Sequence, residues 1–345
     1  MDRSEIQLNA YAKINLSLEI TGKREDGYHD IMSLMQDIDL YDVITIKNCA
    51  ENGTKYNLPH CTIDGVVVYL CTDAKTIPAD MSNLAFKGIK AVLGGYMGRK
   101  MAAEAGADAE QSGETDGMTP DEAEDDFCIN IPRELVVSID KRLPVAAGIA
   151  GGSGNGAACM LGLNALMGYP FSLRELMELG VRVGADVPFS LMMNARRNAG
   201  MLAGMAGLEE ASAAAWVSGI GDIVEPASPI SRHVIMANPG ISVSTKDAYT
   251  AIDSLKSYSG ESSKKLFIND LESYTLAGYP EAAELKHLME EEIEADTVLM
   301  SGSGPTMIAY YSEQDKACSD FSKLEKISKS HNGWRIWFTQ TGCTL

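Results

Sequence analysis

A glycine-rich run lies between a strand-like and a helix-like stretch near the middle of the chain. Residues 143–158 read LPVAAGIAGGSGNGAA, after a strand-like run at 135–143 and before a helix-like run at 156–168. Small residues let a backbone adopt positive φ angles and approach a ligand closely. The start of the helix adds unpaired N–H groups and the positive end of a dipole. The arrangement predicts a cradle for phosphate, lined by Gly151, Gly152, Ser153, Gly154 and Asn155.

A tight turn built from small packing residues would give the same run, so the pattern alone leaves both interpretations open. The chain contains neither GxxxxGKS nor GxxxxGKT, which excludes a phosphate loop of the Walker type. No GxGxxG follows the strand, so a dinucleotide site is not expected.

The size and charge of the chain exclude several classes of protein. Its 345 residues are enough for two domains, and no apolar run is long enough to span a membrane. The N-terminal stretch lacks the apolar core of a signal peptide, and seven cysteines without metal-ligand spacing favour reduced thiols in the cytoplasm. The formal net charge of −19 disfavours nucleic acid and anionic membranes as partners. An anionic small substrate can still bind local groups and a metal cation.

Two segments have a biased composition. Helical spacing at 83–93 is followed by a stretch at about 94–126 that is rich in glycine, alanine and acidic residues, and we expect a mobile surface insertion there. A metal site made of its carboxylates is the alternative. The second segment, 194–215, is dominated by alanine, glycine and methionine. It predicts a long loop or a loosely packed helix, to which we assign no chemistry.

The N-terminal stretch places several polar side chains together. Residues 6–20 roughly alternate between apolar and polar, which predicts a strand with Lys13 and Asn15 on one face. Lys13 would either reach solvent or stay near an anionic ligand. Asp26 and Gly27 favour a hairpin turn, directly followed by Tyr28 and His29. These two rings would simply begin the next strand, or would contact a base and a phosphate.

A second polar residue of interest follows a predicted helix. Ser172 and Glu175 have the spacing of a capping box, and the helix should end near Gly184. Asp186 comes next, and Val187 should be extended because Pro188 follows it. A carboxylate in such an apolar setting either caps a helix or has a chemical role.

The last third of the chain has the element order of an α+β sandwich. From residue 233 onward the patterns predict a strand, helices, a strand, a turn, a strand, a helix and a strand, an order of ferredoxin-like type. A second glycine-rich turn, Ser301–Gly304, could close over the same ligand as the first.

Three motifs now stand in a fixed order: AYAKINLSLEITGKREDGYH, PVAAGIAGGSGNGAA and MSGSGPT. Together with GADVPF at 184–189 they strongly resemble the GHMP kinase superfamily, whose members phosphorylate small-molecule alcohols. The first motif is most similar to the branch that acts on a cytidyl-diphospho alcohol in the non-mevalonate route to isoprenoid precursors. The resemblance implies a two-domain α+β fold, with a ribosomal S5 domain 2-like ATP-binding domain at 1–230 and a ferredoxin-like domain at 231–345. The segments near 94–126 and 194–215 would be insertions in the first domain.

The resemblance also implies roles for individual residues. Asp186 and Lys13 match the catalytic aspartate and lysine, and ATP with Mg²⁺ is the expected phosphoryl donor. The matching loop for ATP comprises Pro144, Ala146, Gly148, Ala150, Gly151, Gly152, Ser153 and Gly154. The matching positions for the cytidyl substrate are Asn15, Tyr28, His29, Asn155, Thr245 and Tyr249. The only expected partner is this small molecule, and neither nucleic acid nor a membrane is expected to bind. The expected oligomeric state is a monomer or a homodimer.

Some residues depart from the family pattern. Ala146 and Ala150 stand where the family commonly has glycine, and Gly154 replaces a serine. Alanine is tolerated there if both positions have negative φ angles. Two other functions stay open: a GHMP kinase for a different alcohol, such as homoserine or mevalonate, and a nucleotide-binding regulator without turnover. The DGYH turn and Tyr249 argue against the first, and the presence of both Lys13 and Asp186 argues against the second.

Overall fold

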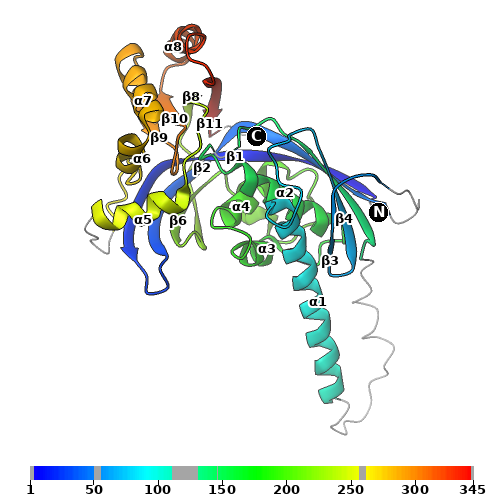
Figure 1. The fold of residues 1–345 in the computed structure, drawn as a ribbon. Coiled ribbons are helices and arrows are strands. Elements are labelled where there is room, and N and C mark those ends of the chain that lie inside the picture. Colours follow the sequence, from blue (N-terminus) through cyan, green and yellow to red (C-terminus); the bar gives the residue numbers. More distant parts are fainter. Residues whose placement is uncertain (1–3, 50–55, 111–130, 146, 256–261, 343–345) are drawn as a thin grey trace.

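The computed structural model describes residues 4–49, 56–110, 131–145, 147–255 and 262–342. Strands and helices follow one another in a mixed α+β order (Figure 1). Their bounds are β1 Glu5–Lys23, β2 His29–Asn48, β3 His60–Ile63, β4 Val66–Thr72, α1 Leu84–Glu110, β5 Glu134–Asp140, α2 Gly151–Leu166, α3 Leu173–Gly180, α4 Val187–Arg197, the 3₁₀ turn η2 Leu208–Glu210, β6 Ala214–Gly219, β7 Ile223–Ala227, β8 Arg232–Asn238, α5 Thr245–Leu255, α6 Glu272–Gly278, α7 Pro280–Glu292, β9 Thr297–Met300, β10 Met307–Tyr311, α8 Gln314–Ser328 and β11 Arg335–Thr341.

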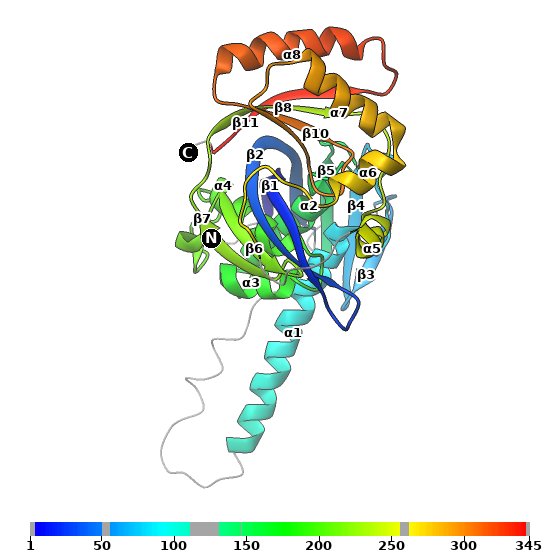
Figure 2. The same cartoon turned by 90° about the vertical axis from the view of Figure 1, so that its left-hand side faces the viewer.

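The two long strands β1 and β2 form an antiparallel hairpin through the centre of the molecule (Figures 1 and 2). The expected turn joins them, and Gly27 has the positive φ that such a turn requires. The pairing register shifts at three places, between Tyr11 and Lys13, between Asn15 and Ser17, and near Ile20. Such bulges re-aim side chains, and the first two flank the polar residues of β1.

Helices and the C-terminal layer cover opposite sides of this hairpin. In Figure 1, α2, α3 and α4 lie below it, whereas β8 to β11 with α7 and α8 lie above. One apolar core joins β1, β2, β4 and β5 to helices α1 to α4, and another joins β1 and β2 to β8, β9 and β10. The sheet β11-β8-β10-β9 has the predicted element order of a ferredoxin-like unit, and its described pairs are antiparallel.

The structure corrects the expectation for the first biased segment. Helix α1 does not end near residue 93 but continues to Glu110, and its far end projects away from the body (Figure 2). Alanine-rich sequence is a strong helix former, and Tyr96 is buried while Gly95 packs against Leu179 and Phe171. The acidic residues at 111–126, with the metal site considered for them, lie outside the described residues.

The second biased segment is also built into the domain. Its start is the end of α4, its end pairs with β2 as strand β6, and Leu202 and Met205 are buried between them. Residues 198–213, between α4 and β6, contain only turns and η2, so the expected long loop is present, but none of residues 194–215 lines the cavity described below. The small residues of this segment allow it to pack closely on the domain, whereas its composition alone suggested a loose insertion.

Two further properties of the sequence can be compared with the structure. Among the described residues, no helix is both long and apolar enough to cross a membrane. The described cysteines are free thiols, as expected, and burial raises the pKa of Cys159 to about 12. That thiol is therefore a packing residue rather than a nucleophile.

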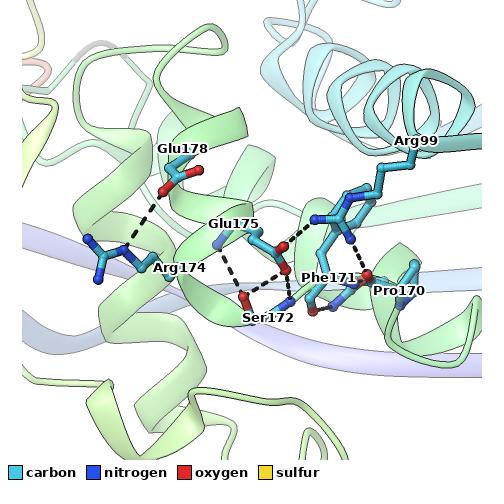
Figure 3. A network of polar contacts seen from close by, with 8 residues as sticks. Arg99, Pro170, Phe171, Ser172, Arg174, Glu175 and Glu178 are labelled. Atoms are coloured by element: carbon cyan, nitrogen blue, oxygen red, sulfur yellow. Dashed lines mark hydrogen bonds and ion pairs between the residues drawn. The ribbon is translucent and has the colours of Figure 1, made fainter. Parts of the chain in front are cut away.

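The predicted capping box is present at the start of α3 (Figure 3). Ser172 accepts a hydrogen bond from the Glu175 backbone, and Glu175 Oε2 accepts from the Ser172 backbone at 2.8 Å. Arg99 from α1 binds Glu175, donates to the Pro170 carbonyl oxygen at 2.6 Å and lies over the Phe171 ring. This contact fastens α1 to the start of α3.

Ser172→Ala should lower the free energy of unfolding by about 1 kcal/mol, because it removes the cap. The pKa of Glu175 is lowered, since hydrogen bonds from Ser172 and Arg99 outweigh the opposing effect of burial. A carboxylate with a depressed pKa stabilises the fold above its unfolded-state pKa and loses this effect as pH falls through the folded value. The difference in stability between the parent and Ser172→Ala should therefore shrink below a pH of about 4. Urea unfolding measures the free energy of unfolding of the parent and of each variant. The exposed Ser322→Ala on α8 is the control, and equal stability of Ser172→Ala and Ser322→Ala would contradict the capping role.

Candidate active site

One cavity of about 1090 Å³ brings together residues from both halves of the chain. Its walls come from β1, the β1–β2 turn, the glycine-rich run with the start of α2, the start of α4, helix α5 and the turn at 302–303. A volume of this size suits a cofactor-sized or nucleotide-sized ligand. The cavity is therefore the candidate site.

Lys13 is held inside this cavity rather than reaching bulk solvent. Its side chain is 3% exposed, and Nζ lies 3.5 Å from Asp186 Oδ1 and donates to Asn15 Oδ1 at 2.7 Å. The Lys13 backbone N–H also donates to the Ile149 carbonyl oxygen at 3.1 Å, which ties β1 to the glycine-rich run. A buried ammonium needs such partners, so the solvent-reaching alternative is wrong.

Asp186 lies at the N-cap of α4, directly before the first helical residue. The expectation of an extended Val187 is wrong, because Val187 already belongs to the helix and Pro188 occupies its first turn. Proline is tolerated there, since the N–H it lacks would have no intrahelical partner. The Asp186 side chain makes no capping hydrogen bond, so its carboxylate faces Lys13 and the cavity instead.

Helix α4 is fastened to β1 at its other end. Asn194 Oδ1 accepts from the Tyr11 backbone N–H at 2.8 Å, and Asn198 binds both the N–H and the carbonyl oxygen of Asn9. Tyr11 adjoins the bulge before Lys13. One helix thus carries Asp186 at its start and holds the strand of Lys13 near its end. Sequence reasoning assigned no chemistry to this segment and missed both asparagines.

The glycine-rich run does not form a loop throughout, because α2 already begins at Gly151. Ala150 is its N-cap residue with φ 55°, so the condition of a negative φ, under which alanine would be tolerated without strain, is not met at this position. A left-handed alanine costs roughly 1–2 kcal/mol, and the first turn of α2 is formed despite this cost. Gly151, Gly152 and Ser153 accordingly present helix N–H groups to the cavity, the arrangement that suits an anion.

The second glycine-rich turn closes on the first, as the sequence suggested. Ser301 Oγ donates to the Gly148 carbonyl oxygen at 3.0 Å, and Gly302 and Ser303 line the cavity. Gly148 has φ 74°, and a β-carbon there would collide with the Ser301 carbonyl oxygen. Thr245 on α5 contacts Ser303 through their hydroxyl groups at 2.8 Å.

Aromatic residues gather at the end of the cavity beside the β1–β2 turn. Tyr28 is 62% exposed at the turn, whereas His29 is buried and packs against Tyr249 with ring centroids 5.5 Å apart. Asp253, one turn after Tyr249 on α5, lies 2.7 Å from His29 Nε2. Burial and the nearby charge of Asp186 raise the pKa of Tyr249, so its hydroxyl is neutral at physiological pH.

The cavity contains most of the site residues that the sequence predicted. Of the described ones only Gly154 is elsewhere, because it packs on β1, where a β-carbon would lie 2.8 Å from the Tyr11 carbonyl oxygen. Ala146 lies outside the described residues. Those lining the cavity are Lys13, Asn15, Tyr28, His29, Pro144, Gly148, Ala150, Gly151, Gly152, Ser153, Asn155, Asp186, Thr245 and Tyr249.

Other lining residues gave no signal in the sequence. Asn83 and Leu84, at the start of α1, lie in the wall, as does Lys141. The Lys141 side chain is 7% exposed and pairs with Asp42 at 2.5 Å, close to the start of α2. Only the fold brings these residues to the glycine-rich run.

The donor set of the cavity indicates how it could hold a metal ion. Within the described ranges, no group of three or more histidine, cysteine, aspartate or glutamate residues could hold one alone. Asn155 Oδ1 is buried in the wall and has no hydrogen-bond partner among the described residues. The described part of the cavity therefore lacks enough protein ligands to hold a metal ion alone, and it suits a metal ion that is bound mainly by anionic oxygens of the ligand itself.

Comparison with known proteins places these features in context. A model of the GHMP kinases N terminal domain matches residues 122–194. A 4-diphosphocytidyl-2-C-methyl-D-erythritol kinase of Alkaliphilus oremlandii is 32% identical over 342 residues, and one of Alkaliphilus metalliredigens is 31% identical over 341 residues; each alignment covers 94% of both chains. A crystal structure of 4-(cytidine 5'-diphospho)-2C-methyl-D-erythritol kinase has a TM-score of 0.63 at 22% identity, covering 98% of this chain and 100% of that chain. This last likeness shows the shared fold.

Proposed function

The chain belongs to the 4-diphosphocytidyl-2-C-methyl-D-erythritol kinase family of GHMP kinases, and we propose that it transfers the γ-phosphoryl group of ATP to the 2-hydroxyl of that alcohol. The observation that carries the proposal is the pairing of buried Lys13 with Asp186 at 3.5 Å in one cavity with the start of α2. An anion cradle beside a base and a cation provides the three parts that phosphoryl transfer needs.

Each part has a defined task in the transfer. Asp186 accepts the proton of the attacking hydroxyl, whose oxygen then bonds to the γ-phosphorus while the bond to ADP breaks. The Lys13 ammonium stabilises the negative charge that develops on the phosphoryl oxygens. The N–H groups of Gly151, Gly152 and Ser153 hold the phosphates in line. No covalent nucleophile is required.

Mg²⁺ would arrive with the nucleotide. Its ligands are usually substrate phosphates, water and one or two protein oxygens, which agrees with the absence of a carboxylate cage among the described residues. The Ser153 hydroxyl, at the start of α2, is the protein oxygen that we assign to it. When bound, the ion neutralises charge on the β- and γ-phosphates.

The aromatic end of the cavity is assigned to the cytidyl group. Tyr28 offers an exposed ring for stacking, and the buried His29 ring, in contact with Tyr249 and Asp253, lines the cavity beside it. Thr245 lies at the same end, next to Ser303. Asn15 lines the wall, but its amide is occupied by Lys13 and Ser33.

Tyr28→Ala should raise the KM for the cytidyl alcohol about 10- to 100-fold, because base–aromatic stacking is worth ~1–3 kcal/mol. The KM for ATP should change little. Steady-state kinetics with each substrate varied in turn measures both values, and Tyr169→Ala, outside the cavity, is the control. A change confined to the KM for ATP would show that Tyr28 does not contact the alcohol.

Phosphoryl transfer from Mg·ATP to 4-diphosphocytidyl-2-C-methyl-D-erythritol tests the function directly, next to homoserine and mevalonate as acceptors. Turnover with the cytidyl alcohol alone is the expected result. Turnover with another alcohol instead would favour the second kinase function, and nucleotide binding without any turnover would favour a regulator.

We also propose the division of the chain near residue 230, with ATP binding assigned to residues 1–230. The cytoplasm is the proposed location, since the substrate ATP and the free thiols of the described cysteines both suit a reducing interior. We propose no partner other than these small molecules. For the oligomeric state we propose a monomer or a homodimer.

A further inference from the structure

A row of buried hydrogen bonds connects β2 to Lys13. Ser33 Oγ donates to the Ser17 carbonyl oxygen at 2.6 Å, and Asn15 Nδ2 donates to Ser33 Oγ at 2.7 Å. Lys13 Nζ donates to Asn15 Oδ1, also at 2.7 Å. All four residues are at most 3% exposed. Because an unpaired polar atom is costly at such depth, each group depends on its neighbour.

The row has only one possible direction. A serine hydroxyl carries one proton, and Ser33 gives it to a backbone carbonyl, which can only accept. Ser33 Oγ must therefore accept from Asn15, and only the amide nitrogen can donate. The amide oxygen then points the opposite way, toward Lys13, which has donors only. If the Asn15 amide were reversed, its NH₂ group would face the Lys13 ammonium, so that two donors would meet. The amide oxygen would then face Ser33, whose only proton is already donated to Ser17.

A bulge makes this geometry possible. The β1–β2 register shifts between Asn15 and Ser17, so that Asn15 is opposite Met35 while Ser17 is opposite Leu34. Bulges re-aim side chains, and here Asn15 reaches both Lys13 and Ser33. Ser33 does not line the cavity, whereas Asn15 and Lys13 do. Ser33 can therefore act on the site only through them.

We propose that Ser33 is a positioning residue, which sets the Asn15 amide so that its oxygen holds the Lys13 ammonium beside Asp186. This rests on the phosphoryl transfer proposed above. A lysine has a flexible four-carbon stem, and its 3.5 Å contact with Asp186 is long for a hydrogen bond. The contact with Asn15 is the shorter one, and it fixes where the charge lies before the phosphoryl group moves.

Two matched substitutions test the role of the hydroxyl. Ser33→Thr keeps it and adds a methyl group, whereas Ser33→Val has nearly the shape of threonine and no hydroxyl. Any strain from the added volume is therefore shared by both variants. We expect Ser33→Val to have a kcat about 10- to 100-fold below that of Ser33→Thr, because small misplacement of a catalytic group has effects of this size. The KM values for ATP and the alcohol should stay within about threefold of each other in the two variants.

A second readout follows the amide itself and needs no turnover. The side-chain NH₂ signal of Asn15, assigned by its loss in Asn15→Asp, should exchange with solvent slowly in the parent protein and in Ser33→Thr. In Ser33→Val it should exchange at least about 10-fold faster, since its acceptor is gone. Ser190→Ala is the control, because that hydroxyl is buried on α4 and has no hydrogen-bond partner in the part of the chain that the structure describes. It should leave kcat and the Asn15 signal unchanged.

Each outcome decides the proposal. A loss of kcat and of amide protection in Ser33→Val but not in Ser33→Thr supports it. Full kcat in Ser33→Val overturns it, and so do equal losses in both variants, which would assign the effect to volume. If the parent transfers no phosphoryl group to the cytidyl alcohol, the proposed function fails; the amide exchange of the Thr and Val variants then still decides whether Ser33 sets Asn15.

Discussion

Asp186→Asn is expected to lower kcat about 10²- to 10⁴-fold, because an amide cannot accept the proton of the attacking hydroxyl. The dissociation constant of ATP should change little, since the N–H groups at the start of α2 are untouched. Asparagine has the shape of aspartate, and the Asp186 side chain makes no capping hydrogen bond that could be lost, so α4 should begin at the same residue. Steady-state kinetics and calorimetric titration with nucleotide measure the two quantities separately.

A matched control separates the role of this carboxylate from the loss of a charge elsewhere. Asp140→Asn removes an exposed carboxylate of β5 that pairs with Arg142, and it should keep the parent kcat. Parent-level turnover in Asp186→Asn would show that the proton leaves by another route and that Asp186 acts at most as an orienting group.

The parts of the fold with local signals were predictable. Alternating strands, the DG turn and the Ser172–Glu175 capping box depend on neighbours in the sequence, and the structure contains them all. The order of elements after residue 232 likewise gave the ferredoxin-like sheet. Local chemistry fixes such elements because their hydrogen bonds and turn angles involve residues close in the chain.

Other parts depended on tertiary contacts that no local pattern records. Helix α1 continues past Gly94 and Gly95, two residues that usually weaken helices, because the helix packs on Leu179 and Phe171 and Arg99 binds the start of α3. Ala150 adopts a left-handed φ at the start of α2, a conformation that alanine adopts only at a cost in free energy. Packing supplied the free energy that local propensity lacked.

The candidate site divides in the same way. Lys13 and Asp186 were named from their motifs, but their 3.5 Å separation follows from the fastening of α4 to β1 by Asn194 and Asn198. Ser33 is 18 positions away from Asn15 in the chain, and the two side chains meet only because of a bulge between β1 and β2. Sequence motifs therefore identified the groups that would contact the ligands. They did not identify the residues that hold these groups in place.

Lys13→Met should lower kcat about 10²- to 10³-fold, because loss of one donor to a developing charge in a water-excluded site has this effect. Methionine is close to lysine in length and apolar, so it can fill the buried position. Asn15 Oδ1 loses its donor, which should lower the free energy of unfolding by about 1–3 kcal/mol. Kinetics and urea unfolding measure the two effects, and the exposed Lys47→Met on β2 should change neither.

The double variant Lys13→Met with Asp186→Asn decides whether the two residues act as one unit. If the ammonium serves mainly to keep Asp186 charged and in place, removing it after Asp186 is already neutral should cost little more kcat. The combined loss should then be close to the larger single loss, as for groups that act together. If the two losses instead multiply, Lys13 acts on the phosphoryl group independently of Asp186. The 3.5 Å contact would then record proximity rather than coupling.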